Sequence, residues 1–251
     1  MLVRQSVCGK IPQISKPAED RDLSGLQTPT AAGYNAAHDL LAPNLAARPG
    51  KIAVIDDDGA YSYAQVAARA DRCSAALLEL GAAAGDRVAL CLLDGVDLIA
   101  CFLGAITVGL IPIPLNTLLT ADDYGYILSD SGAVAAVVSP SLRDRVSDGA
   151  RAAGWPGKIV GPDDLDHASA TSAPTRWTAP DSPAFWLYSS GSTGRPKGVI
   201  HRHGALRETA DLFGEAVLGV RETDVVFSAA KLFFAYGLGN GLTFPLSLIH
   251  I

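Results

Sequence analysis

Residues 188–198 read Tyr-Ser-Ser-Gly-Ser-Thr-Gly-Arg-Pro-Lys-Gly, and apolar residues flank this stretch at 184–187 and 199–200. The flanking residues predict two strands that hold the ends of a loop of small residues. Such a loop lets backbone N–H groups surround an anion, its hydroxyl groups add donors, and Lys197 adds a positive charge. The stretch therefore predicts a polyphosphate-binding loop, and an ordinary Gly/Ser surface loop is the alternative.

The spacing of this loop differs from that of the Walker A phosphate loop, which has four residues between its first Gly and a Gly-Lys pair. Pro196 stands at that position after Gly191, and Val199 stands there after Gly194. The stretch resembles instead the phosphate-binding signature of the adenylate-forming superfamily. That superfamily contains acyl-CoA and aryl-CoA synthetases, luciferases and the adenylation domains of peptide synthetases.

The resemblance implies that the loop contacts the β- and γ-phosphates of ATP while a carboxylate attacks the α-phosphate. It also implies that CoA is the second substrate and that Mg²⁺ accompanies ATP. The residues expected to bind ATP are Ser189, Ser190, Gly191, Ser192, Thr193, Gly194 and Lys197.

An aromatic-rich segment follows at residues 231–246, with Phe233, Phe234 and Tyr236 close together beside several glycines. Its Phe-Phe-Ala-Tyr-Gly run resembles the acyl-pocket segment of benzoate–CoA ligases and related aryl-CoA ligases. The resemblance implies a flat aromatic acid as the substrate, because aromatic walls suit a ring better than a long alkyl chain. The expected acid-binding residues are Phe234, Ala235, Tyr236 and Gly237. An ordinary buried aromatic cluster is the alternative.

The sequence upstream of the loop predicts alternating helices and strands. Ser62 and Gln65 form the pattern of a capping box, apolar residues then recur at helical spacing, and Gly81 ends the helix. Strands are expected at 87–93, 110–115 and 133–138, a helix at 96–108, and a further capped helix from Thr120 and Asp123. This order predicts an α/β fold in which helices cover parallel or mixed sheets, as in part of the large N-terminal domain of an adenylate-forming enzyme.

Residues 98–115 carry no charge, so their length alone permits a membrane span. Two prolines and two glycines interrupt this run, which favours a helix followed by a buried strand.

His201 and His203 alternate after the loop and would face one side of a strand. Two ligands do not complete a zinc site, and the resemblance instead associates His203 with the nucleotide loop.

The composition is that of a globular enzyme core. The chain has 251 residues, of which 49% are hydrophobic and 18% charged, and its net charge is −6. This charge argues against nucleic acid or an anionic membrane surface as a partner. The cysteines lack CxxC spacing, and the first thirty residues contain no apolar signal-peptide segment, so we expect a cytoplasmic protein with reduced thiols.

We expect residues 1–33 to be a loose extension and residues 34–247 to be part of an adenylation domain. Residues 246–251 match one translation of a transposon-end adapter used in sequencing libraries, so 248–251 are expected to be non-native. A native apolar strand is the alternative for these residues. The resemblance places the adenine, ribose and magnesium motifs, the catalytic Lys and the small C-terminal domain beyond residue 251.

The sequence thus predicts the N-terminal part of an aryl-CoA ligase that resembles benzoate–CoA ligase and is inactive as this piece alone. Two alternatives stay open. The acid could be hydroxybenzoate, aminobenzoate, an alicyclic acid or a fatty acid. The chain could also be a non-catalytic nucleotide-binding fragment.

Overall fold

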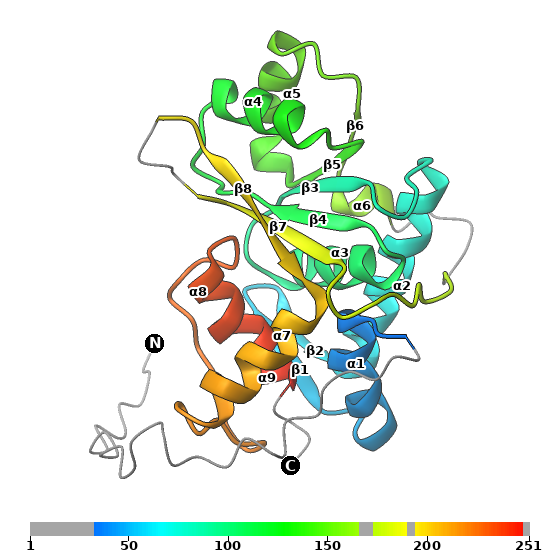
Figure 1. Ribbon diagram of the computed structural model, residues 1–251, viewed down its shortest axis with the longest axis vertical. Coiled ribbons are helices and arrows are strands. Elements are labelled where there is room, and N and C mark those ends of the chain that lie inside the picture. Colours follow the sequence, from blue (N-terminus) through cyan, green and yellow to red (C-terminus); the bar gives the residue numbers. More distant parts are fainter. Residues whose placement is uncertain (1–32, 166–172, 190–193, 248–251) are drawn as a thin grey trace.

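The computed structural model describes residues 33–165, 173–189 and 194–247 (Figure 1). Residues 1–32 of the expected extension at 1–33, and the whole of the expected non-native tail at 248–251, lie outside these residues. At the centre is a four-stranded parallel sheet in the order β4-β3-β5-β6. Its strands are β3 (Arg87–Cys91), β4 (Ile111–Pro114), β5 (Ala135–Val138) and β6 (Lys158–Val160). The predicted α/β fold with a parallel sheet is confirmed.

Both faces of this sheet are buried, which explains why its strands read as continuous apolar runs. In β3, Val88 and Leu90 face one hydrophobic cluster, whereas Ala89 and Cys91 face a second cluster on the opposite side. The first cluster contains residues of α2 (Tyr63–Glu79) and α3 (Val96–Thr107). The second contains residues of α4 (Ala121–Ser131) and α5 (Arg143–Ala152). Helix pairs therefore cover each face.

The helices begin where the capping residues predicted. Ser62 and Gln65 form a capping box at the start of α2, and Thr120 and Asp123 form one at the start of α4. Within the uncharged run at 98–115, residues 98–107 belong to α3 and residues 111–114 form the buried strand β4, as expected. Within the described ranges, no helix is long and apolar enough to cross a membrane.

Two antiparallel hairpins accompany the parallel sheet. One joins β1 (Ile52–Asp56) to β2 (Gly59–Ser62), and the other joins β7 (Pro183–Ser189) to β8 (Lys197–Arg202). The second hairpin confirms the two strands predicted around the phosphate loop. Val199 and Ile200 of β8 are nevertheless exposed, because β8 pairs only with β7 in the described part of the chain.

Further helices lie before the first hairpin and after the second in the sequence. Helix α1 precedes β1, and a run of short helices follows β8 and lies with α1 at the same end of the molecule (Figure 1). The remaining elements are α1 (Ala36–Ala47), the 3₁₀-helix η2 (Pro140–Leu142), α6 (Pro162–Leu165), α7 (His203–Thr209), the π-helix η3 (Ala210–Glu215), α8 (Ala235–Leu238), the π-helix η4 (Gly239–Thr243) and α9 (Phe244–Ser247).

The prediction that His201 and His203 share one face of a strand is wrong. Strand β8 ends at Arg202, and His203 is the first residue of α7. The backbone N–H of His203 bonds to the carbonyl of Ser182, and that of Gly204 bonds to Pro180. These bonds turn the chain into a helix at the point where alternation in the sequence suggested a longer strand.

Candidate functional site

The predicted phosphate loop connects the two strands of the β7–β8 hairpin. Ser189 and Lys197 face each other across the hairpin as the last paired residues before the loop. Ser190, Gly191, Ser192 and Thr193 lie outside the described residues. Gly194 has φ = +107°, a backbone conformation that L side chains rarely adopt, so a glycine is required there. The hairpin therefore fixes the two ends of the loop.

The two cations at the end of the loop differ in their surroundings. Arg195 pairs with Asp122, with 3.3 Å between Nη1 and Oδ2, and its guanidinium lies 4.8 Å from the centre of the Tyr126 ring. Among the described residues, no carboxylate pairs with Lys197, which is exposed. Of these two cations, Arg195 is therefore held by α4, whereas Lys197 is exposed at the start of β8, and its role in binding an anion stays a prediction.

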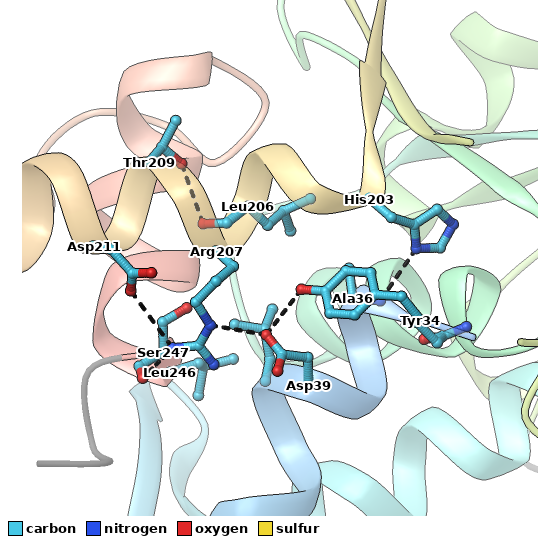
Figure 2. Close-up of polar contacts among 12 residues, drawn as sticks. Tyr34, Ala36, Asp39, His203, Leu206, Arg207, Thr209, Asp211, Leu246 and Ser247 are labelled. Carbon is cyan, nitrogen blue, oxygen red and sulfur yellow. Dashed lines mark hydrogen bonds and ion pairs between the residues drawn. The ribbon is translucent and has the colours of Figure 1, made fainter. Parts of the chain in front are cut away.

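The residue that follows β8 anchors the hairpin to α1. His203 is buried, and its Nδ1 accepts a hydrogen bond of 3.1 Å from the backbone N–H of Ala36 (Figure 2). Burial lowers the pKa of His203 to about 4, so its ring is neutral near pH 7. Tyr34 packs edge-on against the same ring, with 6.4 Å between the centroids. His203 therefore links the end of the hairpin to the start of α1 through a buried, neutral ring.

Arg207 ties three helices together one turn further along α7. Its Nε donates to Asp39 of α1 at 2.9 Å, and its Nη1 donates to the carbonyl of Ser247 in α9 at 3.0 Å (Figure 2). Tyr34 also donates to Asp39, at 2.9 Å. Burial lowers the pKa of Arg207, but the hydrogen bond and the charge of Asp39 outweigh this effect and raise it. Helix α7, which follows the β7–β8 hairpin, is therefore held against both α1 and α9.

The aromatic segment divides into a buried and an exposed part. Phe233 is buried, whereas Phe234 and Tyr236 are 51% and 69% exposed. The rings of Phe233 and Phe234 lie 4.6 Å apart. The core alternative thus describes Phe233, while Phe234, Ala235 and Tyr236 present an exposed surface on which a ligand could rest.

Two features hold this segment in place. A Cβ atom on Gly237 would lie 2.0 Å from the carbonyl oxygen of Lys231, so the close return of the chain requires a glycine. Asp94, which follows β3, accepts a hydrogen bond of 3.2 Å from the backbone N–H of Leu232 and lies 3.6 Å from Lys231 Nζ. The sequence did not reveal Asp94, because 138 positions separate it from Leu232.

The structure does not bring the two predicted sites into direct contact. Between the described ends of the loop and residues 234–237 there is no hydrogen bond or ion pair. Helix α7 packs on η4, which directly follows α8, so the two segments belong to one packed body. In the described part of the chain, no group of three or more His, Cys, Asp or Glu residues could hold a metal ion.

Comparisons with known proteins agree with this geometry. The chain is 51% identical over 237 residues to benzoate–CoA ligase of Thauera aromatica, and the match covers 86% of this chain and 43% of that protein. It is 41% identical over 226 residues to a 4-hydroxybenzoate–CoA/benzoate–CoA ligase of Rhodopseudomonas palustris, covering 86% and 42%. Among solved structures, a benzoate CoA ligase of Burkholderia xenovorans LB400 matches with a TM-score of 0.78 and 43% identity, covering 86% and 44%.

The chain thus spans less than half the length of the relatives that it matches. A family profile described as AMP-binding enzyme matches residues 41–248, which include the sheet, the hairpin and the aromatic segment. This match extends over most of the chain, and this protein therefore belongs to the AMP-binding enzyme family.

Proposed function

We propose that this chain is the N-terminal part of an aryl-CoA ligase. In the proposed reaction a carboxylate attacks the α-phosphate of ATP to give an acyl-adenylate and pyrophosphate, and the thiol of CoA then displaces AMP. The observation that carries the proposal is the Ser/Thr/Gly sequence that links β7 to β8, with Lys197 exposed and not paired with a carboxylate among the described residues. The likeness to two benzoate–CoA ligases supports it.

The loop would act electrostatically. Lys197 and the N–H and hydroxyl groups of the loop would hold the β- and γ-phosphates and stabilise the charge that develops on pyrophosphate as it leaves. Ser189 and Gly194 belong to this set from the described residues, and residues 190–193 complete it in the sequence. Mg²⁺ would neutralise part of the triphosphate charge when it is bound.

The acid would lie against the exposed side of the aromatic segment. Phe234 and Tyr236 offer exposed aromatic surface, and Ala235, which stands between them in the sequence, adds only a small side chain. Gly237 contributes mainly by letting the segment fold back on Lys231. Hydroxybenzoate is a second candidate, because the relative from Rhodopseudomonas palustris carries both acids in its name. A cytoplasmic location fits the buried reduced thiols of Cys73 and Cys91.

The test compares Lys197→Ala with a Lys158→Ala control in the full-length gene product. Lys158 is also exposed, but it lies on β6 and donates to the carbonyl of Leu80. We expect benzoate-dependent exchange of pyrophosphate into ATP in the wild type. In Lys197→Ala, kcat/KM for ATP should fall about a hundredfold, in keeping with the loss of one preorganised charged donor.

Protein stability serves as the check on this experiment. Because Lys197 is exposed, its removal should change the free energy of unfolding by less than about 0.5 kcal/mol. Unchanged ATP kinetics in Lys197→Ala would return the loop to the ordinary Gly/Ser alternative. If octanoate supports the exchange and an aromatic acid does not, the proposed attack of a carboxylate on ATP would stand, but the assignment of an aromatic acid would be refuted.

A further inference from the structure

One face of α4 lies against the ends of the phosphate loop. Asp122, Tyr126 and Asp130 are spaced four residues apart in α4 and therefore share this face. Each of them contacts the β7–β8 hairpin, at Arg195, Pro196 and Tyr188 respectively. These hairpin residues flank the loop on both sides, so one face of α4 contacts the residues at both ends of the loop.

The strongest of these contacts holds the β7 side. Tyr188 Oη donates to Asp130 Oδ2 at 2.6 Å, directly before the last residue of β7. Burial, together with this hydrogen bond, raises the pKa of Tyr188. Gly198 pairs with Tyr188 across the hairpin, and a Cβ atom there would come within 3.3 Å of the Tyr188 ring. The ring therefore crosses over a position that has no side chain.

Tyr126 holds the other side of the loop. Its hydroxyl shares its one hydrogen between two acceptors, the carbonyl of Pro196 at 3.3 Å and Asp130 Oδ1 at 3.4 Å. The guanidinium of Arg195 lies over the Tyr126 ring. The Arg195–Asp122 pair is 58% and 81% exposed, so it adds little by itself. The tyrosine thus contacts two successive residues immediately before Lys197.

Helix α4 is a rigid support for these contacts. A Cβ atom on Gly125 would lie 2.4 Å from the carbonyl oxygen of Gly149, and one on Gly149 would lie 2.0 Å from that of Ala121. The backbones of α4 and α5 therefore touch. On the inner face, the fully buried Tyr124 donates to the carbonyl of Asn116 at 2.8 Å. The helix cannot shift without breaking this packing.

We propose that Tyr126 and Asp130 are positioning residues for the phosphate loop. They fix Tyr188 on one side and Arg195 and Pro196 on the other, and so set the separation and direction of Ser189 and Lys197. The proposal rests on the proposed function, in which Ser189 and Lys197 contact ATP. It also explains why Arg195 is engaged by α4 while Lys197 remains available.

The first measurement is amide hydrogen exchange in the 251-residue chain without nucleotide. We expect Tyr126→Phe, which removes only the hydroxyl, to accelerate exchange at residues 194–198 about fivefold, as for one lost hydrogen bond. Tyr126→Leu should have a larger effect. The matched controls are Tyr61→Phe and Tyr61→Leu, because Arg69 lies 5.3 Å from the centre of the Tyr61 ring at a site away from the hairpin.

The second measurement is the steady-state kinetics of the full-length gene product. Tyr126→Phe and Asp130→Ala should raise KM for ATP about fivefold and leave KM for the acid unchanged. Asp130→Asn should restore part of the loss, because its amide oxygen still accepts from Tyr188. A merely structural role would lower stability and change both KM values together.

The outcomes separate the two proposals. Equal exchange at residues 194–198 in Tyr126→Leu and Tyr61→Leu would overturn the positioning role. A wild-type protein that does not use ATP would overturn the proposed function, whereas accelerated exchange at these residues would still support the contact with α4. A rise in KM for ATP without any change in KM for the acid supports both.

Discussion

Acidification should destabilise this protein through His203. The imidazole is 2% exposed, and Nδ1 accepts the N–H of Ala36, so the native ring carries its proton on Nε2. Protonation of Nδ1 would remove this acceptor and leave a buried charge without a partner. The backbone N–H of Ala36, in the first turn of α1, would then lose its partner as well.

The size of the effect follows from the pKa of His203. Burial lowers this pKa from 6.5 to about 4, which corresponds to about 3 kcal/mol between the two protonation states. Between these two pH values the unfolded chain binds the proton more readily than the folded chain. The free energy of unfolding should therefore be fully retained above pH 6.5 and should fall by up to about 3 kcal/mol as the pH drops to 4.

Denaturant unfolding, followed by tryptophan fluorescence, gives the free energy of unfolding of the wild type and His203→Gln. It is measured between about pH 4.5 and 7.5 in steps of about half a pH unit. Gln keeps a hydrogen-bond acceptor but packs less well than the imidazole, so the variant should have a lower free energy of unfolding at pH 7. Because Gln does not titrate, the variant should lose less stability on acidification. His201→Gln is the control. His201 is only half-buried and stacks on Phe185, so its smaller lowering of pKa should contribute less. Equal pH slopes in wild type and His203→Gln would refute the reasoning.

Three further predictions concern the acid site and the extent of the chain. Replacing Ala235 with Leu in the full-length product should lower kcat/KM for benzoate about tenfold to a hundredfold and spare ATP binding, since overpacking an apolar site costs about 1–3 kcal/mol; unchanged benzoate turnover would contradict this. Gly237→Ala should destabilise the chain by about 1–3 kcal/mol in denaturant unfolding, because of the contact with Lys231, while Gly50→Ala, with open space around it, should be neutral. The 251-residue chain alone should form no benzoyl-CoA in a thioester assay, because it matches only 43% of the length of a benzoate–CoA ligase; measurable product would show that these residues suffice.

The sequence by itself determined the features that depend on neighbouring residues. A capping box needs only residues three positions apart, so the starts of α2 and α4 could be read directly. Continuous apolar runs between helical segments predicted the parallel strands, since both faces of such strands are buried. The two strands that flank the proposed phosphate loop were predicted in the same way, because the loop and its flanking strands are contiguous in the sequence.

Only the tertiary structure decided which side chains are buried and which distant residues meet. Phe233 and Phe234 are adjacent and chemically identical, yet only Phe233 enters the core. His203 does not continue strand β8, because its backbone N–H and that of Gly204 bond to carbonyls of residues 180–182 and α7 begins there. Tyr126 reaches Pro196 across 70 positions, a contact that depends on how α4 lies on the sheet. Local patterns fix short-range hydrogen bonds, but the packing of whole elements selects the long-range contacts that support the site.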